Sequence, residues 1–315
     1  MATLIRSTDV GAPVLTGIAG TLIQVLDYCL INTLSWTKTY SGTNKAVYQM
    51  PAGSNGHYLR VDDTLAQTFR IRGFETVSDV DTGTGPFPTD AQVSGGLWGK
   101  RSSASDTVAR KWWLVGHGGF FHLVIDTHNN GGHLQGIRFG GLVNSPVADP
   151  YNTIIQGSSS SPAASQIHAL GGDGSSANPL GSIGAVAGSY IARTFTQVGG
   201  SVSFSILPEG GVWTGSTKQA CNSAASIDLP YPEPNTGALN LMRLRAYQAG
   251  SFRGRIPGLW APAHNPGGMT GIASNDLITG SAGGDLSGRG FLALQDAAAT
   301  NTAFIFNEIT GDWTS

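Results

Sequence analysis

Residues 45–74 contain three short runs, Lys45-Ala-Val-Tyr-Gln49, His57-Tyr-Leu-Arg-Val61 and Thr68-Phe-Arg-Ile-Arg-Gly-Phe74. Each run is rich in aromatic and β-branched residues and is bounded by Gly, Asn, Ser or Pro, which is typical of strands joined by turns. Asn55-Gly56 favours a type I′ turn before the second run, because both central residues of that turn need a positive φ. The stretch therefore predicts an antiparallel sheet of neighbouring strands.

The same pattern recurs along the rest of the chain. Further strands are predicted at Trp112–Val115, Phe120–Asp126, Tyr190–Thr196, Val202–Leu207, Leu239–Tyr247, Gly290–Leu294 and Ala303–Ile309. Between Leu241 and Tyr247, apolar residues alternate with Arg243 and Arg245, which predicts a half-buried strand with one basic face. Trp112-Trp113 must point to opposite faces of their strand, so we expect one ring in the core and the other on a second buried face or at a subunit contact.

One segment near the N-terminus predicts a helix. From Gly17 onward, apolar residues recur at the spacing of a single helical face. They are Ile18, Leu22, Val25, Leu26, Cys29 and Leu30. Thr16 or Thr21 would serve as the N-cap of the helix, and Asn32 would close its C-terminus. We expect the apolar face to pack against the first sheet.

Together these patterns predict a mainly β fold. The expected architecture is a β-sandwich or barrel-like body with one N-terminal amphipathic helix, which could divide into two β subdomains. We expect a helix and β-rich domain over residues 1–143 and a C-terminal β-rich domain over residues 190–315. Residues 144–189 include Ser/Gly-rich stretches without apolar periodicity, which predict a long loop or junction.

Composition excludes several classes of protein. The 315 residues include 18 Lys and Arg against 20 Asp and Glu, a net charge of −2, so no nucleic-acid partner is expected. No apolar run approaches the ~18 residues of a membrane span, and no signal-peptide pattern follows the start. Cys29 and Cys221 are expected to be free thiols. The 45 glycines and the 12% of charged residues favour a turn-rich subunit of an assembly.

Two groups of residues could in principle hold a metal ion. His117, His122, His128 and His133 lie close together in sequence with Asp126, but ligands along one strand are spread over ~13–20 Å, too far for one tetrahedral centre. In Ser78–Gly85, Asp79 and Asp81 resemble the start of a calcium loop. Asp90 stands where the loop needs a Glu, so an ion-free turn is favoured and no metal is expected.

The sequence contains no motif for a catalytic nucleophile or a nucleotide. Ser94–Ser102 resembles a phosphate loop superficially, but it lacks the first glycine and a following helix. Asp62, Asp63, Glu75 and Asp126 could supply the carboxylate pair of a hydrolase acting on envelope sugars. The adjacent Asp62-Asp63 is more typical of a cap or of hydrogen bonds to the backbone. We therefore expect no catalytic residues and no cofactor.

Tryptophan rings could stack on sugars or bases. The candidates are Trp98, Trp112, Trp113, Trp213, Trp260 and Trp313. A β-rich core of this size also uses such side chains, so a core role is the alternative.

Several stretches, taken together, resemble virion structural proteins of tailed bacteriophages. They are Gly11–Gly17, Gly20–Asp27, Ser35–Lys38, Ser41–Tyr48, Tyr58–Asp63, Gly73–Glu75, Asp79–Pro88 and Arg253–Trp260. The similarity covers residues 1–130 and, more thinly, residues 251–315. The resemblance implies a place in a particle and transfers no catalytic residues.

The resemblance implies a non-enzymatic structural subunit attached to the capsid, the neck (collar) or the tail. We expect other virion proteins as partners, and assembly in the host bacterial cytoplasm. A homo-oligomer is expected, a ring or trimer, with the Ser/Gly-rich segment Ser158–Ser182 partly buried at a subunit boundary. The alternative is a tail-tip or fibre-base module that binds a host surface glycan through exposed Trp and Tyr.

Overall fold

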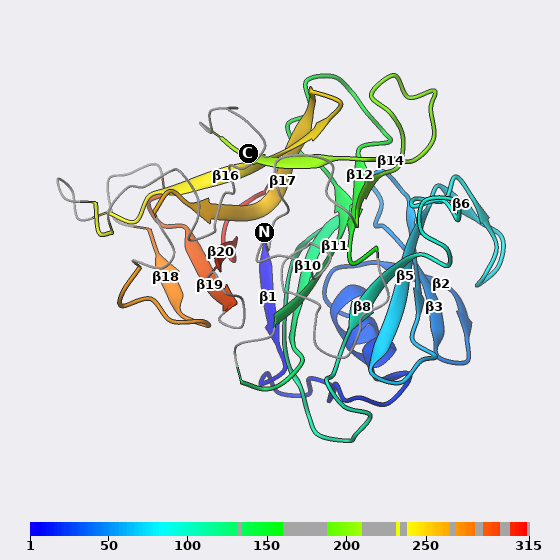
Figure 1. Cartoon of the computed structure of the whole chain (residues 1–315), viewed down its shortest axis with the longest axis horizontal. Helices are drawn as coiled ribbons and strands as arrows, with labels where there is room; N and C mark the ends of the chain where they lie inside the picture. Colours follow the sequence, from blue (N-terminus) through cyan, green and yellow to red (C-terminus); the bar gives the residue numbers. More distant parts are fainter. Residues whose placement is uncertain are drawn as a thin grey trace.

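The computed structural model describes residues 1–130, 134–159, 188–209, 231–233, 238–264, 269–280, 286–296 and 303–313. Within these residues the chain is mainly β, with antiparallel sheets and one short helical segment (Figure 1). The mainly β prediction is confirmed. The barrel-like alternative is wrong, because each sheet of described strands is open at both edges. No helix among the described residues is long and apolar enough to cross a membrane.

A five-stranded sheet follows the N-terminal helix. In spatial order its strands are β2 (Thr37–Gly42), β3 (Lys45–Gln49), β4 (Tyr58–Asp62), β5 (Thr68–Phe74) and β8 (Leu97–Lys100). The predicted type I′ turn is wrong, because Gly56 has a φ of 72° but Asn55 is not in the left-handed region. Instead Asn55 belongs to a longer loop and donates to Asn152 Oδ1 at 2.7 Å and Thr153 Oγ1 at 2.8 Å.

A seven-stranded sheet lies at the centre of the molecule. Its order is β1 (Thr3–Arg6), β9 (Lys111–His117), β10 (Phe120–Asp126), β11 (Leu134–Gly141), β12 (Thr153–Gln156), β13 (Ser189–Ile191) and β14 (Val202–Ser203). Every residue of β10 is buried, because both faces of this sheet are covered. Trp112 packs in one core and Trp113 in the other, so of the two placements predicted for the second ring, the second buried face is the one observed.

A six-stranded sheet covers the second face of the central sheet. Its order is β15 (Ser205–Pro208), β16 (Leu241–Gln248), β17 (Ser251–Pro262), β20 (Ala303–Glu308), β19 (Gly290–Asp296) and β18 (Leu277–Thr279). In β16, Leu244 and Ala246 are buried while Arg243 and Arg245 are half-buried on the other face, as predicted. A separate hairpin joins β6 (Thr76–Val77) to β7 (Gly83–Thr84).

Two large hydrophobic cores separate the three sheets. The first core lies between the five-stranded and central sheets and includes Phe69, Trp112 and Phe139. The second lies between the central and six-stranded sheets and includes Trp113, Leu259 and Ile305. In Figure 1 the five-stranded sheet is at the right, the central sheet in the middle and the six-stranded sheet at the left.

The predicted helix is present but starts later than expected. Helix α1 (Thr21–Leu26) continues into a π-helix, η1 (Asp27–Ile31), whose C-cap is Asn32 as predicted. Ile18 precedes the helix and is exposed, whereas the other predicted apolar positions are buried in the first core. Neither Thr16 nor Thr21 caps it, because Gly20 occupies the N-cap in the left-handed region, with φ 88°.

The central sheet contains strands from both sides of the predicted junction. Strand β12 lies within residues 144–189, and β13 pairs with it although most of β13 belongs to the predicted C-terminal domain. The chain passes from the central to the six-stranded sheet between β14 and β15. Most of Ser158–Ser182 lies outside the described residues, as do Cys221 and Trp213. The domain limits stay a prediction.

Candidate functional site

The outer face of the five-stranded sheet gathers charged side chains. Alternate residues of β4 are buried in the first core, so Arg60 and Asp62 project from the opposite face. The strand register sets Asp62 between Lys45 of β3 and Arg70 of β5. The charged face is defined here as Lys45, Arg60, Asp62, Arg70 and Arg72, with Asp81 and Asp90 from adjoining loops.

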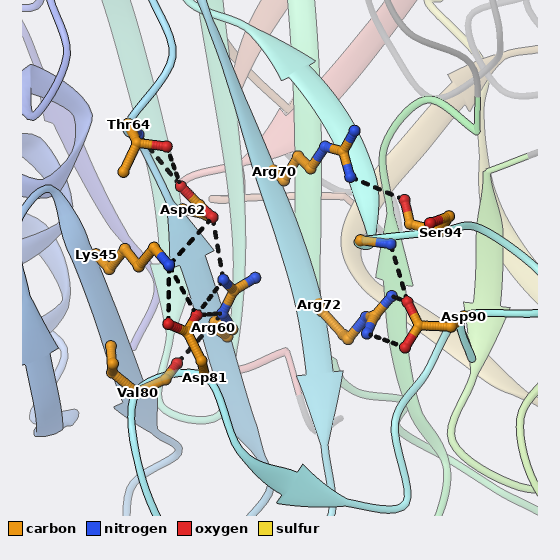
Figure 2. Close-up of polar contacts among 11 residues, drawn as sticks. Lys45, Arg60, Asp62, Thr64, Arg70, Arg72, Val80, Asp81, Asp90 and Ser94 are labelled. Carbon is orange, nitrogen blue, oxygen red and sulfur yellow. Dashed lines mark hydrogen bonds and ion pairs between the residues drawn. The ribbon is translucent and has the colours of Figure 1, made fainter.

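The turn of the β6–β7 hairpin brings Asp81 to this face (Figure 2). Lys45 Nζ donates to the two carboxylate oxygens of Asp81 at 3.0 and 2.8 Å. Arg60 Nε donates to Asp81 Oδ1 at 3.0 Å and to the carbonyl oxygen of Val80 at 3.2 Å. Arg60 also donates to Asp62 Oδ2 at 3.0 Å. The hairpin is thereby attached to β3 and β4.

Asp90 attaches a second loop to the same face. Arg72 donates to its two carboxylate oxygens at 2.6 and 3.1 Å, and the backbone N–H of Gly95 donates at 3.0 Å. Arg70 donates to the carbonyl oxygen of Ser94 at 2.9 Å, and its guanidinium lies 3.9 Å from the ring centre of Trp98. The loop between β7 and β8 is therefore held against β5 (Figure 2).

These cations keep the two loop carboxylates ionised. The hydrogen bond from Lys45 is the main cause that lowers the pKa of Asp81. Hydrogen bonds from Arg72 and then Gly95 lower the pKa of Asp90 to about 2. A general acid or base works best with a pKa near the operating pH. Asp81 and Asp90 are therefore suited to ion pairing and unsuited to proton transfer.

Asp63 follows Asp62 of the charged face in the chain, but it is fully buried. Its Oδ2 accepts a hydrogen bond from the backbone N–H of Leu22 at 2.9 Å, at the start of α1, and its Oδ1 accepts one from Arg101. Burial raises the pKa of Asp63 to about 7, although Arg101 and the backbone N–H groups act to lower it. Neither side chain of the pair has exposed area, so the carboxyl has no access to a substrate. The prediction that this carboxylate caps a helix or accepts hydrogen bonds from the backbone is confirmed, and the structure shows that its partner is α1.

The other candidate carboxylates have separate partners. Glu75 forms a two-point ion pair with Arg193 at 2.6 and 2.5 Å. Asp126 is buried and accepts a hydrogen bond from the backbone N–H of His128 at 3.2 Å. The contacts of Asp62, Asp63, Glu75 and Asp126 therefore assign each carboxylate to a different local structure.

The candidate histidines also occupy different surroundings. His122 is buried, donates from Nε2 to the carbonyl oxygen of Pro257 at 2.7 Å, and has a pKa lowered to about 3, mainly by burial. His117 lies 3.5 Å from Asp312, and His128 contacts Thr127. His133 lies outside the described residues. Within the described part of the chain, no three His, Cys, Asp or Glu side chains gather as metal ligands.

The two candidate binding loops are ordinary β structure. In Ser78–Gly85 the backbone N–H of Ser78 donates to Thr82 at 3.0 Å, so the prediction of a turn is confirmed. Ser94–Ser102 contains strand β8, whose backbone pairs with β5. The N–H groups of Gly95 and Gly96, just before β8, already donate to Asp90 and Val93, so they are not free to surround a phosphate.

The tryptophans serve mainly as core residues. Of the candidates, Trp112, Trp113, Trp260 and Trp313 are buried, and Trp98 is half-buried beside Arg70. Stacking on a sugar needs an accessible ring face. These five rings therefore offer little of the exposed aromatic surface that the glycan-binding alternative requires.

Two hollows open elsewhere on the described surface. One, of about 540 Å³, is lined by Ser54, Gly118, Leu142 and other residues beside His117. The other, of about 680 Å³, is bounded by Tyr231, Arg243, Phe291 and neighbours, with Glu209 as its acidic side chain. Neither lining includes, among the described residues, the two carboxylates that sugar hydrolysis needs.

Sequence reasoning misses the charged face, although part of its signal is present. Charged residues alternate with apolar residues in β4 and in β5, which would predict one charged face. The contacts of Asp81 and Asp90 have no such signal in the sequence, because they depend on how two loops return to the sheet.

Compared with known proteins, the sequence matches no family model and no curated relative.

Proposed function

We propose that this chain is a non-enzymatic structural subunit of a tailed-phage virion, attached to the capsid, the neck or the tail. One observation carries the proposal. The stretches that resemble phage virion proteins contain Lys45, Arg60, Asp62 and Asp81, and these residues pair with one another on the charged face. Motif residues that attach a hairpin to a sheet maintain a shape, which favours a structural role over a catalytic one.

The architecture supports the same function. Three sheets that share two cores favour a layered β-sandwich body, which suits a subunit with large contact surfaces. Its partners in this proposal are other virion proteins and further copies of the chain, and its location is the virion.

Quantitative mass spectrometry of purified particles tests this function. The particles should come from the virus that encodes the chain, and the chain should be present in a fixed ratio to the major capsid protein. Recovery of the chain from infected cells but not from particles would contradict the proposal.

Purified chain should also leave particle adsorption and envelope material unchanged. Competition for adsorption would favour the glycan-binding module, and clearing of envelope material would favour a hydrolase.

A further inference from the structure

A third, smaller hollow opens on the six-stranded sheet, on the face turned away from the second core. In the strand register Arg245 of β16 lies opposite Arg255 of β17. Two residues earlier in β16, Arg243 lies opposite Trp260, so β17 carries extra residues between the two pairs. One of them is Gly258, whose φ is 65°. A bulge of this kind bends its strand and redirects the side chains beside it.

Three guanidinium groups line this arginine hollow, defined here by Arg243, Arg255 and Arg289. Arg255 and Arg289 keep 29% and 24% of their side chains exposed, so a dissolved ion can reach them. The space among the three is about 20 Å³, which is room for about one water molecule. A ligand would therefore insert one anionic atom and keep its remainder outside.

The glutamates on this face already have several partners. Glu209 Oε1 accepts hydrogen bonds from Arg245 Nε at 3.0 Å and from Arg255 Nε, so one oxygen serves two guanidinium groups. Glu308 accepts from Arg289 Nη1 at 2.7 Å, and its other oxygen accepts from an indole N–H of β17. Neither glutamate therefore offers a separate carboxylate to each arginine beside it.

Arg243 adds a further positive charge to the arginine hollow. Its guanidinium lies 4.9 Å from the ring centre of Trp260. Burial, and then the charges of Arg255 and Arg289, lower the pKa of Arg243, which shows that the like charges are close. Asp312 also lines the hollow, but its side chain is 57% exposed. Cations that gather around one hollow, in a chain with a net charge of −2, attract an anion.

We propose that the arginine hollow binds the phosphate group of a small ligand, with Arg243, Arg255 and Arg289 as donors. Guanidinium groups bind carboxylates and phosphates through paired hydrogen bonds. Three of them around one point favour a phosphate, because it offers more oxygens than the two of a carboxylate. The site goes beyond the structural role proposed above and does not rest on it.

The phosphate could be free or part of an ester, and the neighbouring hollow of about 680 Å³ separates these sources. The two hollows share Arg243 and Trp260, and the larger one is also lined by Leu241 and Phe291. An ester whose apolar body enters the larger hollow should bind more tightly than inorganic phosphate. Inorganic phosphate and phenyl phosphate are therefore the two probes.

Calorimetric titration of the full-length chain at constant ionic strength tests the site. Arg243→Gln removes one donor, and Arg243→Lys keeps the charge but loses the paired hydrogen bonds. Arg70→Gln is the matched control, because Arg70 also stacks on a tryptophan, Trp98, at 3.9 Å, on a different sheet. Arg255→Gln is a second variant of the hollow, and melting curves check that every variant folds.

Wild type and Arg70→Gln should bind phenyl phosphate at one site with equal affinity. Arg243→Gln and Arg255→Gln should each weaken binding about tenfold or more, and Arg243→Lys should weaken it less. Tighter binding of phenyl phosphate than of inorganic phosphate would identify an ester as the ligand, and equal binding would identify the free ion. Absence of binding by wild type, or an equal loss in Arg70→Gln, would overturn the proposal.

Discussion

Asp62 and Asp63 are neighbours in the chain, but they belong to two regions with opposite surroundings. Asp62 lies on the charged face, where it pairs with Arg60 and keeps 18% of its side chain exposed. Asp63 lies beneath α1, fully buried against Arg101. An exposed ion pair contributes about 0.2–1 kcal/mol, whereas removing one partner of a buried pair costs about 3–5 kcal/mol. Burial, and not the presence of an ion pair, therefore sets how much each aspartate matters for stability.

The largest effect is expected where a charge enters the buried region without a partner. Leu26→Asp places a carboxylate in the first core, where Leu26 has no exposed area. The free energy of unfolding should fall by about 5 kcal/mol, from lost packing and a desolvated charge. Denaturant titration measures it. Gln24→Asp, on the exposed side of α1, is the control, and equal stability of the two variants would place Leu26 outside the core.

Removing the buried aspartate should be the next largest change. Asp63→Ala leaves Arg101 buried without its carboxylate and removes the acceptor of the Leu22 N–H. We expect a loss of about 3–5 kcal/mol, against about 1 kcal/mol or less for Asp62→Ala. Both values come from urea unfolding at pH 7. If the two variants lost similar free energies of unfolding, the buried region and the charged face would not differ in their contribution to stability.

The buried region should also produce a pH dependence in mild acid. Burial lowers the pKa of His57 to about 4, and its Nδ1 contacts Thr153 Oγ1 at 2.7 Å. Because the folded pKa lies below the unfolded value of 6.5, the folded state binds fewer protons between these values. The contribution of His57 to the free energy of unfolding is complete above pH 6.5. This contribution decreases as the pH falls to about 4, by at most about 1.4 kcal/mol per pH unit.

The comparison of wild type with His57→Asn isolates this effect. The raised pKa of Asp63 acts in the opposite direction, since its folded form binds more protons between pH 4 and pH 7, but it is common to both chains. Stability measured from pH 7 to pH 4 should decrease less steeply in the variant. Parallel curves would show that His57 does not titrate with folding.

The smallest effect is expected on the charged face. Asp81→Asn removes the ion pairs with Lys45 and Arg60, at a cost of about 0.5–1 kcal/mol that decreases at high salt. Asp79→Asn, in the same turn, should change stability less, because the Asp79 side chain accepts from the backbone N–H of Val80. Melting at low and high salt measures both. A loss above about 2 kcal/mol for Asp81→Asn would show that the charged face behaves as a buried site.

Part of the fold follows from local pattern. The runs Lys45–Gln49, Thr68–Phe74 and Phe120–Asp126 coincide with β3, β5 and β10, because aromatic and β-branched residues between turn residues favour strands. Strands β11 and β17 are not predicted. Glycines interrupt both, and proline also interrupts β17, which weakens any local strand signal.

Tertiary packing stabilises β11 and β17, which have only a weak local strand signal. Gly258 lies directly against the Trp313 ring, so a larger residue would not fit there. The carbonyl of Pro257 accepts the hydrogen bond of buried His122 from the central sheet. These contacts join residues far apart in the chain, so the pattern of neighbouring residues in the sequence does not predict them.

The sequence by itself determined the mainly β class, the buried helix positions from Leu22 to Leu30, and the placing of Trp112 and Trp113 on opposite faces of their strand. Each of these follows from the fixed periodicity of side chains along a strand or helix. Tertiary structure alone decided that Asp63 caps α1 from 41 residues away and that Asp81 reaches Lys45 and Arg60. The physical reason is that ion pairs and caps depend on distance in space, and packing of the sheets and loops sets that distance.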